Sequence, residues 1–298
     1  HRRQPVLVRH GNAGEERAWP LRYARMFDMT NDSHLFLQTP EDDCLPLYEG
    51  KMIWQYSHVF EEPQYWLDST AFDERMRKKE LHRMAQDLGA PRSEISKYEA
   101  QVRYDREFTR LAFREIARDT DERTLIFSLL PKNCGLGHTL FANTAKTYRR
   151  DQASGVDITA VSLLRLLFAL AWFNSVPADW VGRFMIQIHV SLTYLYRLPM
   201  PQPTDAEILS SPDYAQLARN ALLLTLAASW DDFAELAPLF GITRPEVPAT
   251  AKAKDQLRAQ NDKIVASLYG ITDAEFAHLL RSFKGMAAKR PEYLALLQ

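Results

Sequence analysis

This chain has few cysteines, no long uninterrupted apolar run and almost no excess of charge of either sign. Its two cysteines, Cys44 and Cys134, can build neither a disulfide framework nor a zinc site with four cysteine ligands. They predict reduced thiols in a cytoplasmic protein. The longest apolar run, Leu163 to Phe173, is interrupted by Arg165 and is shorter than the roughly 20 apolar residues that cross a bilayer. No signal peptide is visible.

The charge balance excludes a strongly cationic protein. The chain has 37 basic and 38 acidic residues and a formal net charge of -1, so any contact with nucleic acid needs a local basic patch. Its 298 residues, 46% of them hydrophobic, predict a sizeable core in one large or two moderate domains. Because the first residue is His1, we expect a piece of a longer polypeptide.

The chain is organised around the stretch from residue 111 to residue 131. Two apolar runs rich in strand-forming residues, Leu111 to Ala117 and Thr124 to Leu130, flank a polar connector, Arg118 to Arg123. The connector is dense in charge and in turn-forming Asp and Thr. This pattern predicts a strand, a charged loop and a second strand.

Arginines in this stretch are the first candidates for function. Arg114 lies within the first predicted strand, where a guanidinium acts as a buried clamp on a carboxylate or contacts a phosphate. Arg118 and Arg123 in the loop have the same two interpretations. For Arg114 the structural alternative is an ion pair with Glu115, Asp119 or Glu122.

A basic helix is predicted from Phe72 to Leu88. Its apolar residues recur at helical spacing, and its polar face carries Lys78 and Lys79 among several arginines. Such a helix can lie against DNA, and the alternative is a solvated face of the protein. A second short helix is predicted from Arg92 to Tyr104.

Further basic and aromatic residues are candidates for phosphate contacts. Arginines are in excess between His1 and Phe36, which predicts either phosphate contacts or a solvated face. His138 lies in a Gly-x-Gly loop, and Arg197 follows Tyr194 and Tyr196. The structural alternatives are a satisfied polar histidine and core aromatics. Arg149 and Arg150 form one more candidate pair.

Helices dominate the rest of the chain. A helix is predicted for residues 158–174, and an extended exit is predicted from Pro199 to Pro203. Beyond it we predict helices at residues 213–229, 231–239, 249–269 and 273–283. The fold class is therefore α+β, a small mixed sheet with flanking helices and then an all-helical C-terminal region. We expect this last region to brace the sheet or to dock onto a missing part of a longer polypeptide.

One acidic cluster has the residue types of a magnesium-dependent nuclease. Asp42 and Asp43 precede Glu49 and Lys51, and two acids with a lysine can hold a metal ion and position water. The spacing between these acids is short, and a Glu-x-Lys triplet is common by chance. The alternative is that Lys51 meets a phosphate or a neighbouring carboxylate.

Several segments resemble, in the same order, the C-terminal half of Eco57I-like adenine-specific DNA methyltransferases of restriction-modification and phage-defence systems. The resemblance covers almost the whole chain. The segments are Arg25 to Phe36, Leu45 to Ile53, Phe113 to Thr124, Leu129 to Lys132, Gly135 to Leu140, Phe173 to Ser175, Leu198 to Pro201 and Ser267 to Ile271.

The resemblance implies a target-recognition region that grips duplex DNA. It also implies a short helix, Ala178 to Phe184, and then a return segment, His189 to Arg197. In that family a separate part binds S-adenosylmethionine and carries an Asn-Pro-Pro-Tyr type motif for a flipped adenine. This sequence has neither an Asn-Pro-Pro or Asp-Pro-Pro tripeptide nor a glycine-rich loop for the methyl donor. We therefore expect no cofactor and no catalysis in this chain alone, and S-adenosylmethionine in the missing part.

We predict a DNA target-recognition domain at residues 1–200 and a helical region at residues 201–298. The predicted function is sequence-dependent recognition of duplex DNA for an adenine-N6 methyltransferase, with a methylase catalytic domain upstream or in a separate chain as partner. The rival hypothesis is a protein-interaction module of a defence complex that reads no DNA. The predicted DNA contacts are Lys51, Lys78, Lys79, Arg114, Arg118, Arg123, Thr124, His138 and Arg197.

Overall fold

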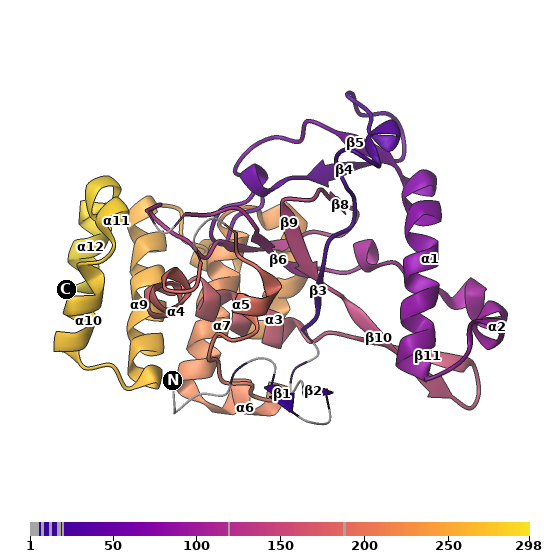
Figure 1. Ribbon diagram of the computed structural model, residues 1–298. Coiled ribbons are helices and arrows are strands. Elements are labelled where there is room, and N and C mark those ends of the chain that lie inside the picture. The colour runs from indigo at the N-terminus through magenta and orange to yellow at the C-terminus, as the bar shows by residue number, and fades with distance from the viewer. Residues whose placement is uncertain are drawn as a thin grey trace.

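A computed structural model describes residues 6, 9–11, 14–16, 19, 21–118, 120–186 and 189–298. The fold is α+β with a helical C-terminal region, as the sequence predicts. Figure 1 shows helix α1 (Ser69–Leu88) on one side of the molecule and helices α9 to α12 on the opposite side, with most of the strands between them. Within the described residues, no helix has the length and apolar character needed to cross a membrane.

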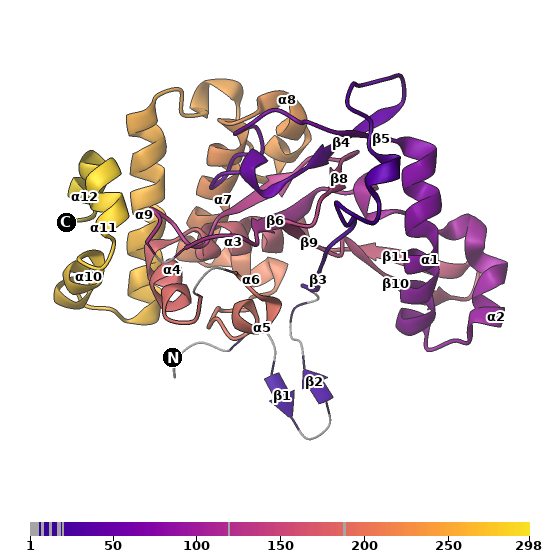
Figure 2. The ribbon, with the colours of Figure 1, turned by 45° about the horizontal axis from the view of Figure 1, so that its top comes forward.

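The described strands form two sheets and two separate hairpins. An antiparallel sheet has the order β3-β9-β6-β7, and a mixed sheet has the order β5-β4-β8, in which β4 and β8 are parallel. Their bounds are β3 Tyr23–Ala24, β4 Cys44–Tyr48, β5 Trp66–Asp68, β6 Arg110–Arg114, β7 Phe127–Leu130, β8 Gly135–Leu136 and β9 Leu140–Asn143. The hairpins are β1 (Arg9–Gly11) with β2 (Gly14–Glu16), which projects in Figure 2, and β10 (Lys146–Asp151) with β11 (Gly155–Ala160).

Strands β6 and β7 confirm the predicted strand, loop and strand. Phe113 of β6 lies opposite Phe127 of β7 and Phe141 of β9, and stacks on both rings with centroids 5.2 Å apart. Phe127 then stacks on Phe173 of α3 (Leu163–Phe173), with centroids 4.6 Å apart. This row of aromatic rings joins the sheet to its covering helix, because face-to-face offset rings bury much apolar surface.

The remaining helices follow in chain order. They are α2 Arg92–Ile95, α4 Val176–Arg183, α5 Leu192–Leu195, α6 Asp205–Ser210, α7 Pro212–Leu226, α8 Trp230–Phe233, α9 Ala251–Tyr269, α10 Asp273–Leu280, α11 Lys284–Lys289 and α12 Pro291–Leu297. Helix α2 is shorter than predicted and continues as a 3-10 helix over Ser96–Gln101. The predicted return segment contains α5.

The helix predicted to begin at residue 158 is wrong at its start. Residues 155–160 form β11, which pairs antiparallel with β10, and α3 begins only at Leu163. The turn between the two strands is closed by the Asp151 carboxylate, which accepts from the Ser154 backbone N–H at 2.7 Å. Gly155 has φ +82°, which a side chain would strain. Pairing with β10 therefore outweighs the helical spacing of the sequence.

The C-terminal helices pack against the sheet-covering helix α3. Helix α7 lies along α3, and α9 lies along α7. One buried hydrophobic cluster includes Phe113 and Phe127 of the sheet, Phe168 of α3, Leu222 of α7 and Val265 of α9. Apolar packing is thus continuous across the predicted boundary at residue 200, and that boundary remains a prediction.

Candidate nucleic-acid interface

Helix α1 carries the most basic surface that the sequence predicts. The Asp68 carboxylate accepts from the Ala71 N–H at 2.8 Å and begins the helix, and Gly89 ends it in the left-handed conformation. The buried side includes Phe72, Met76 and Met84. A stripe at spacing i, i+4, i+7 and i+11 lies beside this buried side. The residues of the stripe are Arg75, Lys79, His82 and Gln86.

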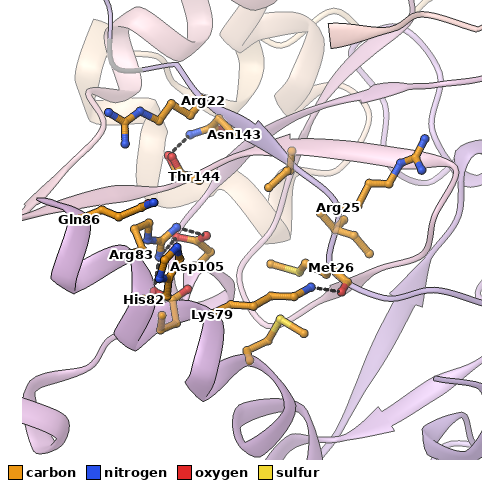
Figure 3. Close-up of a pocket in the computed structure, with 15 residues that line it drawn as sticks. Arg22, Arg25, Met26, Lys79, His82, Arg83, Gln86, Asp105, Asn143 and Thr144 are labelled. Atoms are coloured by element: carbon orange, nitrogen blue, oxygen red, sulfur yellow. Dashed lines mark hydrogen bonds and ion pairs between the residues drawn. The ribbon is translucent and has the colours of Figure 1, made fainter. Parts of the chain in front are cut away.

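A cleft of about 240 Å³ separates α1 from strands β3 and β9 (Figure 3). Its walls include Arg22, Lys79, His82 and Gln86, so most of its polar lining is basic or neutral. The Lys79 Nζ donates to the Met26 backbone carbonyl at 2.8 Å, which holds the lysine across the cleft. Three of the four stripe residues of α1 therefore face this cleft.

A second cleft, of about 670 Å³, adjoins the first one along α1. It is lined by Arg22, Gln86, Asp87, Thr147, Tyr148 and Arg149. Arg22 and Gln86 line both clefts. Exposed cations from three elements thus surround the two adjoining clefts, although the whole chain is nearly neutral. The three elements are the segment before β3, helix α1 and strand β10.

Beneath the clefts lies a buried network of two acids and two bases. Lys146 places Nζ 3.1 Å from both Glu80 Oε2 and Asp105 Oδ1, and Arg83 is paired with the same two carboxylates. Burial by itself would raise the pKa of Asp105, but Arg83 and Lys146 outweigh it and lower the pKa to about 2. The two acids and two bases balance in formal charge, so the basic residues that the clefts have in excess are the exposed cations.

Arg114 is held at the end of β6 between a carbonyl and two aromatic rings. Its Nη2 donates to the Lys51 carbonyl at 3.1 Å, and its guanidinium carbon lies 5.5 Å from the centroid of Trp54 and 5.8 Å from that of Phe60. Burial lowers the pKa of Arg114. Within the described residues it forms no ion pair. The ion pair offered as an alternative for Arg114 is absent among these residues, and Asp119 lies outside them.

Lys51 and His138 lie near this end of β6. Lys51 follows β4 in a 3-10 helix, Gly50–Met52, and its Nζ lies 3.5 Å from Glu49 Oε2. The Gly50 N–H donates to Thr139 Oγ1 at 2.8 Å, which joins this turn to the loop that carries the exposed His138. The structure thus brings together Lys51, Arg114 and the His138 loop.

The nuclease hypothesis fails on geometry. Asp43 and Glu49 flank the five-residue strand β4 at opposite ends. Six residues of extended chain separate their Cα atoms by roughly 20 Å, too far for both carboxylates to bind one metal ion. Within the described residues, no group of three or more potential ligands could hold a metal ion.

The predicted DNA contacts Arg123 and Thr124 are interior residues. Arg123 is 3% exposed and Nε lies 2.8 Å from Oδ2 of the buried Asp179. The Thr124 N–H donates to both carboxylate oxygens of Asp179 at 3.2 Å. A phosphate cannot reach either residue in this conformation. A clamp on a carboxylate was one of the two interpretations of Arg123 from the sequence, and its burial against Asp179 favours that role.

The charged loop before Arg123 is held by hydrogen bonds and an ion pair from other parts of the same chain. Nη2 of Arg183 donates to the backbone carbonyls of Asp121 and Glu122 at 2.8 and 3.0 Å. Arg290 pairs with Glu122 at 3.5 Å, so the C-terminal helices hold the loop. Arg118 is exposed, and its backbone N–H donates to Asp121 Oδ2 at 3.1 Å.

The other predicted contacts lie away from the two clefts. Lys78 is exposed and lines the opposite side of α1, next to Arg92 of α2. Arg197 is exposed after α5. Of the arginines near the N-terminus, Arg2, Arg3 and Arg17 lie outside the described residues, as do several of their neighbours. Arg25 pairs with Glu115 and lies over the Phe141 ring.

Neither Gln86 nor the grouping of Arg22 with Arg149 is predicted by the sequence. Helical spacing could have identified Gln86, because it lies at i+11 in the stripe that begins at Arg75. No signal in the sequence joins Arg22 to Arg149, because residues so far apart along the chain meet only through the fold.

Among the comparisons with known proteins, the one with solved structures gives matches. No known family matches the chain, and no curated protein is similar to it. One solved structure that matches is the Type IIL restriction-modification enzyme MmeI in complex with DNA. The TM-score is 0.45 and the identity 11%, over 92% of this chain and 37% of that chain. This chain therefore spans little more than a third of that protein, and a likeness this distant carries no argument about activity.

Proposed function

We propose that this chain binds duplex DNA as the target-recognition part of an adenine-specific DNA methyltransferase. The observation that carries the proposal is the gathering of exposed cations from three separate elements around the two clefts, in a chain whose net charge is -1. Segregated positive charge of this kind suits a phosphate backbone. The methyl donor S-adenosylmethionine and the pocket for a flipped adenine would belong to another part of the enzyme or another chain.

The segments that resemble the methyltransferase family support this proposal through their positions. Arg25 to Phe36 passes beside α1, where Asp32 accepts from Arg75 at 2.7 Å. Leu45 to Ile53 forms β4 and the turn that carries Lys51. Phe173 to Ser175 lies at the end of α3, where the Asn174 Nδ2 donates to the Phe127 carbonyl of the sheet. These segments form the scaffold that carries the candidate interface.

A salt titration tests DNA binding. Three phosphate contacts, for example by Arg22, Lys79 and Arg149, predict a slope of log K against log salt of about -3, or roughly 40-fold weaker binding between 50 and 200 mM salt. The affinity of the purified chain for a labelled duplex is measured by fluorescence anisotropy. An affinity that does not change with salt, or no binding, contradicts the proposal and favours the protein-interaction module.

Sequence dependence is tested separately. Selection from randomised duplexes at two salt concentrations would recover a motif if this chain recognises its target alone. Binding without a motif would mean that specificity needs the catalytic part. The two results leave DNA binding intact and decide only where the sequence is read.

A further inference from the structure

Arg22 and Gln86 occupy the junction between the two clefts, and Arg149 lies in the second cleft beside them. Arg22 comes from the segment before β3, Gln86 from the last turn of α1 and Arg149 from β10. Figure 3 shows Arg22 and Gln86 on the same side of the first cleft, with Arg25 on the other side. Three elements far apart in the sequence thus place nitrogen donors around one cleft.

The guanidinium of Arg149 is available at this point. Arg149 is exposed and forms no ion pair within the described part of the chain. Asp157 is its partner across the β10–β11 hairpin, yet the two side chains are not paired. An arginine that leaves its cross-strand acid unpaired keeps all five of its N–H donors for a ligand.

Arg22 is only partly neutralised. Its Nη1 lies 3.6 Å from Oδ1 of Asp87, and its side chain is 53% exposed. Asp87 is itself engaged, because its other oxygen accepts from the Tyr148 backbone N–H at 3.1 Å. Asp87 therefore pairs with Arg22 alone, and the Arg149 guanidinium stays without an ion-pair partner among the described residues.

Gln86 adds a neutral donor. Its side chain is exposed, and no hydrogen bond to another described residue engages its carboxamide. An amide N–H next to two guanidinium groups matches a tetrahedral anion with several acceptor oxygens. The donors are N–H groups on different elements, so they approach such an anion from different directions.

We propose that the junction of Arg22, Gln86 and Arg149 binds a phosphate group of one DNA strand. This inference rests on the proposed function. The first cleft, at about 240 Å³, is far smaller than a duplex, so the duplex lies across the mouth and directs one backbone inward. Arg149 and Arg22 contact the phosphate oxygens, and the Gln86 amide donates to one of them.

The decisive experiment compares two neighbouring arginines. Arg149→Ala removes the unpaired guanidinium. Arg150→Ala is the matched control, because Arg150 is also exposed but pairs with Glu94 at 2.9 Å, away from the cleft. Duplex affinity is measured by anisotropy over a salt series. We expect Arg149→Ala to weaken binding about tenfold and to make the salt slope shallower by about 1, and Arg150→Ala to change neither.

A backbone modification locates the contact. Methylphosphonate, which is uncharged, replaces one phosphate at a time in the duplex. At the contacted phosphate the loss in affinity for the wild-type chain should be about tenfold. For Arg149→Ala the loss at that phosphate should be smaller, because only the Arg22 and Gln86 contacts remain to be lost. Gln86→Ala should weaken binding less than Arg149→Ala, and thermal melting checks that each variant is folded.

The outcomes separate the inference from the proposed function. If the wild-type chain binds duplex DNA and the two arginine variants behave alike, the junction does not bind phosphate and DNA binding stands. If the wild-type chain binds no duplex, the proposed function fails. Titration with inorganic pyrophosphate then decides the junction. Binding that Arg149→Ala abolishes supports a site for a free phosphate compound, and no binding overturns the site altogether.

Discussion

The side-chain amide of Asn174 is hydrogen-bonded to both backbone groups of Phe127. Its Oδ1 accepts from the Phe127 N–H and its Nδ2 donates to the Phe127 carbonyl, each at 2.9 Å. Phe127 lies in β7, the edge strand of the antiparallel sheet. Asn174 therefore takes the place of a neighbouring strand and joins the end of α3 to the sheet edge.

Replacing Asn174 by Ala should destabilise the protein by about 1–3 kcal/mol, because the buried N–H of Phe127 loses its acceptor. The Phe127 carbonyl keeps a second donor, the Tyr56 N–H at 3.0 Å. Urea unfolding measures the change. Gln152→Ala, at an exposed position, is the control and should stay within about 0.5 kcal/mol of wild type. Equal effects of the two variants would refute the role of Asn174.

Arg123 and Arg118 should behave oppositely when each is replaced by Ala. Arg123→Ala leaves the buried Asp179 carboxylate without its 2.8 Å partner and should cost about 3–5 kcal/mol of unfolding free energy. Arg118→Ala removes an exposed guanidinium and should cost less than about 0.5 kcal/mol. Chemical denaturation of both variants checks this. A stable, folded Arg123→Ala variant that binds DNA more weakly would instead return Arg123 to the interface.

Asp262 should make stability depend on pH. Burial raises its pKa to about 6, while Arg123 and hydrogen bonds from Tyr293 and the Val176 N–H act in the opposite direction. An unfolded aspartate titrates near about 3.9, so ionisation favours the unfolded chain. The stabilisation from a neutral Asp262 is complete below about pH 4 and is lost as pH rises through about 6.

Asp262→Asn should remove that loss. The amide oxygen can still accept from the Val176 N–H, which now bonds Oδ1 at 2.7 Å. Unfolding free energies of wild type and variant are measured in urea from pH 4 to pH 8. The stability of the wild type should fall relative to the variant across this range. Parallel curves would show that the Asp262 carboxyl keeps the same pKa in both states.

Lys79 and Lys78 provide a test of the side of α1 that meets DNA. Lys79 lines the first cleft, whereas the adjacent Lys78 lines the opposite side of the helix. Lys79→Ala should weaken duplex binding several-fold and make the salt slope shallower by about 1, and Lys78→Ala should leave the slope unchanged. Anisotropy over a salt series measures both. A larger effect for Lys78 would place the DNA on the side of α2.

Local signals were sufficient for the central hairpin and for several helices, but not for the other strands. The charged connector between two apolar runs predicted the hairpin of β6 and β7, since apolar strand-forming runs and turn residues act over a few positions. Caps such as Thr272, which accepts from the Glu275 N–H at 3.3 Å, placed α7, α9 and α10 within a few residues. The helix predicted at residues 231–239 is α-helical only over Trp230–Phe233 and continues as a 3-10 helix, and α6, α11 and α12 were not predicted. Residues 158–160 were misassigned because their pairing with β10 is a contact that helical spacing does not contain.

The roles of charged residues were decided by the tertiary structure. Arg118 and Arg123 come from one charged loop, yet one is exposed and the other lies against Asp179 of α4. Their sequence context is nearly the same, and only the docking of α4 separates them. A run of charged residues indicates that a segment is polar. The ion-pair partners of these residues, however, lie on other elements.

The amino-acid sequence by itself determined the α+β class, the hairpin at the centre and the helical C-terminal region, because these follow from the spacing of apolar residues and from local caps and turns. Only the tertiary structure decided which cations meet. Arg22, Gln86 and Arg149 lie on three elements, and packing of α1 against the β10–β11 hairpin brings them to one cleft. Such convergence depends on long-range packing, which no local pattern encodes.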